Sequence, residues 1–147
     1  MVLPDGAIVV AGGRGDGGDW LSSVELLPGP VGVGAGWLPL PPLLEARHFH
    51  GLAVHGGALI VAGGEFNLSS VEMLSPLPTA RSGGGGGGGG QWTRLSSLSP
   101  ISGPCGLIVH RGRLIAFEKW NSKHTCAYSH SPQELDILYT VTTFLVS

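Results

Sequence analysis

The stretch GALIVAGG at residues 57–64 repeats an apolar run that first appears as GAIVVAGG at residues 6–13. Both copies end in a glycine pair, and the two pairs lie 51 residues apart. A glycine-rich loop after a strand can hold the phosphates of a cofactor, or it can mark a turn in a structural repeat. The choice between these interpretations decides which fold and function the sequence predicts.

A second pair of matching segments follows the glycine pairs. LSSVELLPG at residues 21–29 matches LSSVEMLSP at residues 68–76, now 47 residues apart. The four-residue difference falls between the matched blocks, in RGDGGDW of the first copy and EFN of the second. Insertions collect in loops, so this difference favours a structural repeat.

A third match extends the pattern toward the C-terminus. Residues 36–59 align with residues 91–114 at a constant offset of 55, which pairs Trp37 with Trp92 and His55 with His110. The chain therefore contains a unit of about 50 residues, repeated about two and a half times, which is the period of kelch-type propeller blades.

Each unit predicts short antiparallel strands. GLAVHGGALIVAGG at residues 51–64 has two β-rich runs around a Gly-Gly turn, which predicts a hairpin. SVEML at residues 70–74 predicts a third strand, and the segment after Trp92 predicts a fourth. The run ALIVA at residues 58–62 is apolar throughout instead of alternating, which favours a strand covered on both faces by neighbouring blades.

The order of these elements resembles the kelch repeat. The resemblance rests on the glycine pairs, SSVELL and SSVEML, the paired tryptophans, and LPPLLEARHFHGLAV leading into the next first strand. It implies an all-β fold, a partial kelch-type β-propeller of four-stranded antiparallel blades with an incomplete ring. Leu27 and Leu74 stand where the family usually has tyrosine, and Phe117 and Glu118 stand where a third glycine pair would begin.

The resemblance also organises the chain into units. The first blade is expected to lack its own first strand, and the glycine run at 83–90 is expected to be a loop. The glycines all lie at or before Gly112, so the composition changes where the third unit breaks down. Two interpretations of the tail stay open: a divergent third blade, or a C-terminus that is not native propeller sequence. The expected kelch-repeat region is 1–117, with units of approximately 1–40, 41–97 and 98–117, followed by the tail at 118–147.

The motif GRGDGG at residues 13–18 fits the dinucleotide pattern G-x-G-x-x-G after an apolar run. That site needs a substantial helix next, whereas DWLSSVELL is cut off by Pro28. Within the same loop, Arg14-Gly15-Asp16 spells an adhesion tripeptide, which matters only outside the cell and is expected to be a chance occurrence. We therefore predict no cofactor.

The spacing of the histidine and cysteine residues does not indicate a metal site or a catalytic site. His48 and His50 would share one face of a strand, but neither they nor the tail cluster of His124, Cys126 and His130 have the paired spacing of a zinc site. Cys105 aligns with His50 at the start of a first strand, so packing explains it. No metal and no catalytic residue is predicted.

Charge and composition narrow the class of partner. The net charge is −2 and 12% of the residues are charged, so no basic surface for nucleic acid or an anionic membrane is expected. The N-terminus lacks a signal-peptide pattern and no apolar run is long enough to cross a bilayer. With only two cysteines, these features favour a cytoplasmic location.

The predicted function is a noncatalytic protein-protein interaction module, with a protein partner and a possible homo-oligomer through open propeller edges. The resemblance implies a substrate-recognition part of a ubiquitin-ligase adaptor, or a cytoskeletal (actin) binder. The alternatives are an enzyme on the same scaffold, such as an oxidase or sugar isomerase, and a fragment without independent function. Trp37 is expected to brace neighbouring blades, and Arg47 has the same alternative. The predicted partner-binding residues are Arg14, Asp16, Asp19, Trp20, Arg47, His48, Glu65, Phe66 and Asn67.

Overall fold

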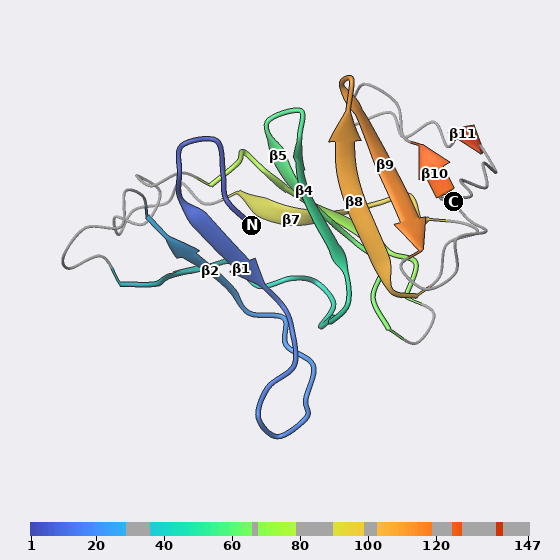
Figure 1. Ribbon diagram of the computed structural model, residues 1–147. Coiled ribbons are helices and arrows are strands. Elements are labelled where there is room, and N and C mark those ends of the chain that lie inside the picture. Colours follow the sequence, from blue (N-terminus) through green and yellow to red (C-terminus); the bar gives the residue numbers. More distant parts are fainter. Residues whose placement is uncertain are drawn as a thin grey trace, which may run out of the picture.

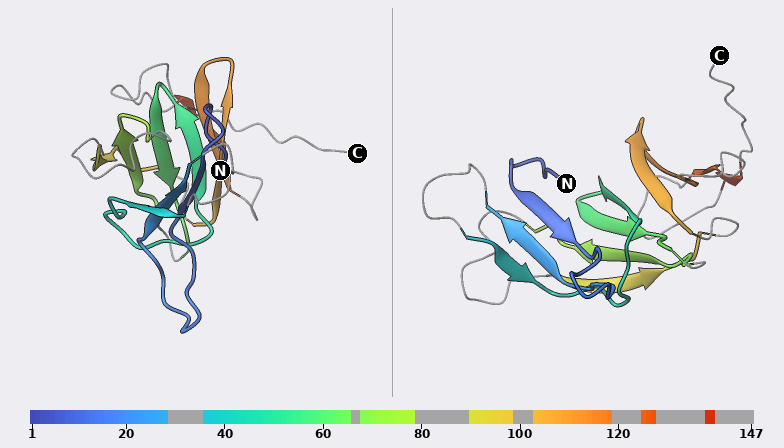
Figure 2. Two further views of the ribbon diagram at one scale, coloured as in Figure 1. Left: turned by 90° about the vertical axis from the view of Figure 1, so that its left-hand side faces the viewer. Right: turned by 60° about the horizontal axis from the view of Figure 1, so that its bottom comes forward.

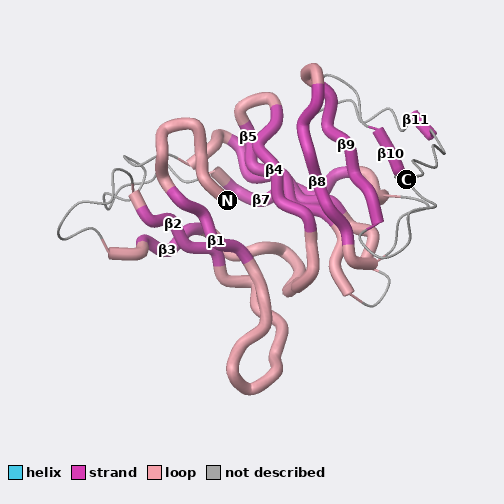
Figure 3. The backbone as a smooth tube through the Cα atoms, in the orientation of Figure 1, coloured by secondary structure: helices cyan, strands magenta, loops and turns pink. Residues whose placement is uncertain are grey.

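The computed structural model describes residues 1–28, 36–65, 68–78, 90–98 and 103–118, and the backbone of residues 125–127 and 138–139. These residues form strands and loops without a helix (Figure 3). The strands make three antiparallel sheets, or blades, of three, four and four strands (Figure 1). No helix of these residues has the length and apolar character needed to cross a membrane.

Blade 1 contains β1 (Ile8–Ala11), β2 (Val24–Leu27) and β3 (Leu38–Leu40) in chain order. Residues before β1 add only an isolated bridge, because Val2 bridges Ile8 and the amide of Val9 donates to the carbonyl of Met1 at 2.9 Å. Blade 1 therefore has three strands and lacks a first strand of its own, as the sequence predicts.

Blade 2 is the middle sheet and has the four strands that the sequence predicts. They are β4 (Gly51–His55), β5 (Ala58–Ala62), β6 (Val71–Ser75) and β7 (Gln91–Leu95), paired in chain order. The first two pair from Gly51 opposite Ala62 to His55 opposite Ala58, around the Gly-Gly turn. The predicted hairpin is confirmed.

Blade 3 contains β8 (Cys105–His110), β9 (Arg113–Glu118), β10 (Thr125–Ala127) and β11 (Leu138–Tyr139). The short strands β10 and β11 continue the sheet from β9. The segment Phe117-Glu118 extends β9 instead of forming a glycine corner, and Phe117 pairs with Gly106. A side chain at Gly106 would collide with the Phe117 ring, so the glycine accommodates this departure from the repeat.

The apolar strand β5 lies at the centre of the molecule, with all five residues buried. Its side chains alternate between two cores. Leu59 and Val61 pack with Val9 and Leu26 of blade 1. Their neighbours on the opposite face, including Ile60, pack with Cys105 and Leu114 of blade 3. The three blades therefore lie side by side with blade 2 in the middle, as Figure 2 shows, and the predicted coverage on both faces is confirmed.

The twin glycines form the predicted corners at the ends of β1 and β5. Gly12 and Gly63 have φ values of 58° and 68°, which side chains rarely adopt. Each corner also touches the segment entering the next blade, because Gly13 donates to the carbonyl of Arg47 at 2.8 Å and Gly64 to that of Gly103 at 3.0 Å. The repeated glycines thus hold adjacent blades together.

Several expectations lie outside the described residues. They concern Phe66 and Asn67, the glycine run except Gly90, and most of the tail after Glu118. The unit boundaries and the origin of the tail stay predictions.

Candidate interaction surface

The glycine corners and the segments that enter the first strands lie along one edge of the blades. This edge is the lower one in Figure 1, where the β1–β2 loop extends beyond the sheets. The loop meets the segment entering blade 2 through the bond from Gly13 to Arg47. The next corner meets the same segment, because the amide of Glu65 donates to the carbonyl of His48 at 3.2 Å. We call this edge the corner edge.

The β1–β2 loop is a folded protrusion. Arg14 bridges Trp20 across the loop, and the amide of Gly15 donates to the carbonyl of Asp19 at 2.8 Å. The Arg14 side chain folds back, with Nε donating to the carbonyl of Gly18 at 3.2 Å. These bonds shape the loop from within, and they leave Arg14, Asp16 and Asp19 exposed to solvent.

The G-x-G-x-x-G motif lies in this protrusion. A dinucleotide site would require the motif to open a helix, but its residues form a loop between antiparallel strands and β2 follows directly. The helix that a phosphate site needs does not follow the motif, and the motif instead forms the turn of a repeat.

An aromatic row connects the protrusion to the segment entering blade 2. The ring centroids of Trp20 and His48 lie 4.9 Å apart, and those of His48 and Phe49 lie 4.8 Å apart. Glu65 fixes the middle ring, because its Oε2 lies 2.5 Å from His48 Nε2. The row therefore joins residues of three separate loop segments into one supported unit.

Phe49 ends this row in an unusual backbone conformation. Its φ is 57°, and its side chain is 46% exposed. A bulky residue in this region is a genuine outlier that costs about 1–3 kcal/mol. The surrounding bonds hold it there, including the bond from the amide of Cys105 to the carbonyl of Phe49 at 3.1 Å. The fold thus places a large apolar ring in solvent at a cost in free energy.

Sequence reasoning did not find Phe49. The expectation that His48 and His50 share a strand face assumed an extended chain through these residues. Instead, β4 begins at Gly51, and the positive φ of Phe49 turns the backbone between the two histidines. Nothing in the residue types indicates this conformation, because it is imposed by contacts with blades 1 and 3.

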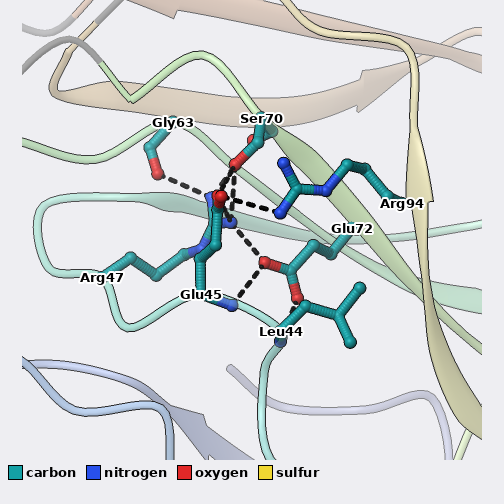
Figure 4. A network of polar contacts seen from close by, with 7 residues as sticks. All are labelled: Leu44, Glu45, Arg47, Gly63, Ser70, Glu72 and Arg94. Carbon is teal, nitrogen blue, oxygen red and sulfur yellow. Dashed lines mark hydrogen bonds and ion pairs between the residues drawn. The ribbon is translucent and has the colours of Figure 1, made fainter.

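Arg47, the neighbour of His48, points inward. Its guanidinium is fully buried and donates to the carbonyls of Gly63 at 2.9 Å and Ser70 at 3.1 Å (Figure 4). It also pairs with Glu72 at 2.5 Å and with Glu45 at 3.4 Å. The Arg47 side chain therefore ties the segment entering blade 2 to that blade, whereas its alternative role was to brace neighbouring blades, and it does not contribute an accessible side chain to the corner edge.

Glu72 and Glu45 complete this network. The buried carboxylate of Glu72 accepts from the amides of Leu44 at 2.7 Å and Glu45 at 3.1 Å. Glu45 accepts a bond from the Ser70 hydroxyl and pairs with Arg94 at 2.7 Å. The Ser70 bond, followed by Arg94 and Arg47, holds the pKa of Glu45 below its ordinary value of 4.5 despite partial burial.

The structure divides the predicted partner-binding residues by accessibility. Arg14, Asp16 and Asp19 are exposed, Trp20 and Glu65 are half-buried, and Arg47 and His48 are buried. Phe66 and Asn67 lie outside the described residues. The expected brace Trp37 is instead 46% exposed, whereas its counterpart Trp92 is 5% exposed and donates through Nε1 to the carbonyl of Pro41 at 2.8 Å. The tryptophan of blade 2, and not that of blade 1, performs the bracing role.

Possible metal ligands do not converge in the described part of the chain. None of its histidine, cysteine, aspartate and glutamate side chains form a group of three or more that could hold an ion. Cys105, considered as a nucleophile, is buried between blades 2 and 3, and its thiol lies 3.5 Å from the carbonyl of Gly106. Packing in the core accounts for this cysteine.

The comparisons with known proteins agree with this geometry. Residues 46–99 match the kelch motif, and this span contains all four strands of blade 2 together with the segment that enters it. No curated protein gives a significant match to the chain. The chain therefore contains a kelch motif, and its three antiparallel blades form an incomplete kelch-type propeller.

Proposed function

We propose that the chain is a noncatalytic protein-interaction module that binds its partner with the corner edge. Kelch repeats are generally interaction domains, and the match over residues 46–99 supports this class of function. Of the predicted residues, Phe66 and Asn67 are retained on sequence grounds only. The binding surface combines the β1–β2 protrusion with the aromatic row, and its members are Arg14, Asp16, Asp19, Trp20, Phe49 and Glu65.

The exposure of Phe49 carries the proposal. Aromatic side chains are enriched among the residues that dominate binding energy in protein interfaces. The Phe49 ring already lies against the His48 ring, and a side chain that is positioned before binding loses less conformational freedom when a partner covers it. Backbone strain of this kind collects at functional sites. In Phe49 the three features coincide, next to a loop that extends beyond the sheets.

The charges around Phe49 indicate the chemistry of the partner. Asp16 and Asp19 supply exposed carboxylates along the corner edge, whereas the guanidinium of Arg14 is engaged by its own loop and the carboxylate of Glu65 by His48. Complementary charge steers association and selects partners. We therefore expect a partner segment with an apolar residue that covers Phe49 and with flanking lysine or arginine.

Capture by the immobilised chain tests the proposal. Phe49→Asn removes the ring, and asparagine tolerates a positive φ better than phenylalanine does, so this variant should remain folded. Leu44→Asn is the matched control, because it removes another exposed apolar side chain of the same segment and leaves the backbone bond to Glu72 in place. Quantitative mass spectrometry of proteins captured from a cell lysate would compare both variants with the unmodified chain.

We expect Phe49→Asn to reduce capture of a defined set of proteins by at least about tenfold, the loss of a strong interface contact. Leu44→Asn should retain that set. Equal capture by both variants would refute the role of the corner edge. Enrichment of ubiquitin-ligase substrates or of actin-associated proteins would select between the two partner classes, and sedimentation with actin filaments would test the second directly.

A further inference from the structure

The outer face of blade 1 turns away from blade 2. The strand register defines it, because Val2 bridges Ile8, Ile8 pairs with Leu27, and Val10 pairs with Glu25. Paired residues share a face, as do alternate residues of a strand. These five side chains therefore form one patch, which we call the front face. Val2 and Val10 are 68% and 48% exposed.

Four of the same positions in blade 2 are buried, and the fifth, Val54, is half-buried. The register there places Val54, Leu59, Leu74, Val61 and Glu72 at the places of Val2, Ile8, Leu27, Val10 and Glu25. The apolar members pack against blade 1. Glu72 accepts hydrogen bonds from two backbone amides of the segment entering blade 2 and pairs with Arg47 of the same segment. The front face thus has the composition of a blade interface, and no blade of the described residues covers it.

Blade 3 presents the complementary face. Ile108 pairs with Ile115, and Gly106 pairs with Phe117 two residues further along β9. Their counterparts in blade 2 include Ala53 and Ile60, which are buried against blade 3. Ile108 is 49% exposed. We call this patch, made of Ile108, Ile115 and Phe117, the back face.

We propose that two copies of this chain associate head to tail, with the back face of blade 3 in one copy covering the front face of blade 1 in the other. Within the chain, the equivalent faces already meet twice, between blades 1 and 2 and between blades 2 and 3. The intermolecular contact continues that repeating interface. Two copies would supply six blades, which is within the four to eight of closed propellers.

The second copy is the partner that fits the chemistry of both faces. Each molecule carries one front face and one back face, so a single heterologous contact can be made twice and close around a two-fold axis. Both faces carry large apolar side chains, and the register adds Glu25 to the front face and His110 and Arg113 to the back face.

Paired substitutions test this arrangement. Val10→Asp places a charge in the front face and leaves the back face intact, whereas Ile108→Asp does the reverse. Phe49→Asn on the corner edge is the control for assembly. Light scattering coupled to size-exclusion chromatography, and sedimentation velocity over a range of concentrations, would measure the mass of each purified variant and of an equimolar mixture of the two.

We expect a dimer for the unmodified chain and for Phe49→Asn. Each aspartate variant alone should weaken dimerisation by at least about 30-fold, the size of a strong interface contact. The mixture should regain a dimer, because it can form one intact front-to-back contact. Recovery in the mixture also shows that both variants are folded.

Three results would overturn the proposal. The unmodified chain could be a monomer at every concentration, or it could form an open polymer. Ile108→Asp could also leave dimerisation unchanged, which would indicate a contact between two front faces. Partner capture at the corner edge is independent of these outcomes, because Phe49 belongs to neither face.

Discussion

Blades 1 and 2 contain the same four residues, SSVE, at the start of corresponding strands, yet the two glutamates have different surroundings. Glu72 is fully buried, accepts hydrogen bonds from the backbone amides of Leu44 and Glu45, and forms an ion pair with Arg47. Glu25 is exposed. The difference comes from the segment that enters each blade, because residues 44–47 cover Glu72 and no described segment covers Glu25. A repeated residue therefore acquires its role from the neighbouring unit, as expected of repeat proteins.

Replacing these two glutamates by alanine should give the largest difference in unfolding free energy. Glu72→Ala leaves the buried guanidinium of Arg47 without its carboxylate and the amides of Leu44 and Glu45 without an acceptor. Breaking a buried ion pair in this way costs about 3–5 kcal/mol of unfolding free energy. Glu25→Ala should change it by less than about 0.5 kcal/mol. Urea denaturation of both variants measures the difference, and equal effects would contradict the comparison.

The corner glycines should behave alike in both blades, in contrast to the glutamates. A side chain at Gly12 would lie 2.5 Å from the carbonyl of Arg47, and one at Gly63 would lie 2.7 Å from Cβ of Cys105. In each case the added side chain would meet residues at the start of the next blade, and both blades 1 and 2 have such a neighbour. We expect Gly12→Ala and Gly63→Ala each to lower the unfolding free energy by about 2–4 kcal/mol, from the positive φ and the collision together.

Gly57→Ala is the control for this prediction, because Gly57 also has a positive φ but has no atom within 4 Å of the added carbon. Gly57→Ala should lower the unfolding free energy by about 1–2 kcal/mol only, because it incurs the cost of the positive φ without a collision. If Gly57→Ala is as damaging as Gly63→Ala, the corners do not join the blades. Thermal and urea unfolding of the three variants decide this.

Replacing the tryptophan of blade 2 should cost more unfolding free energy than replacing that of blade 1, as for the glutamates, but the difference should be smaller. Trp92→Phe loses the bond to the carbonyl of Pro41 and should cost about 1–2 kcal/mol. Trp37→Phe should cost less than about 0.5 kcal/mol, because Trp37 is exposed. Both values follow from urea denaturation. An equal loss at Trp37 would assign it the bracing role that the sequence predicted.

The smallest expected effect is a pH dependence from Glu45. Its folded pKa is lowered, so the unfolded chain binds more protons near and below the ordinary value of 4.5. The stabilisation that Glu45 contributes is therefore complete above that value and is lost as the pH falls through the folded pKa. Glu45→Gln should reduce this dependence, which unfolding curves between pH 3 and 7 can detect, with Glu25→Gln as the control.

The repeat predicted most of the framework because strand formation and turns depend on local residues. The hairpin at Gly51–Ala62, the buried run ALIVA and the glycine corners could all be predicted. The three-stranded form of blade 1 could also be predicted, because no β-rich run of strand length precedes the strand that leads to its glycine corner. The sequence predicted a bracing role for Trp37 and not its exposure, because exposure depends on which distant segment packs against the side chain.

The candidate surface was predicted only in part. The β1–β2 loop and the entry to β4 could be assigned to one edge, because antiparallel strands return their ends to the same side. Burial of Arg47 and exposure of Phe49 could not be predicted, because these two residues of one loop are separated only by His48 and still differ in whether the side chain is covered. That choice depends on the acceptors of blade 2 and on the backbone conformation at Phe49.

The sequence by itself determined an all-β repeat with glycine corners, since period, turn residues and apolar runs act over a few neighbouring positions. Tertiary structure alone decided which copy of each repeated residue is buried. Burial depends on whether another blade or its entry segment lies against that copy, and residues distant in the sequence supply it. The same reason leaves Val10 of the front face and Ile108 of the back face exposed among the residues that the structure describes.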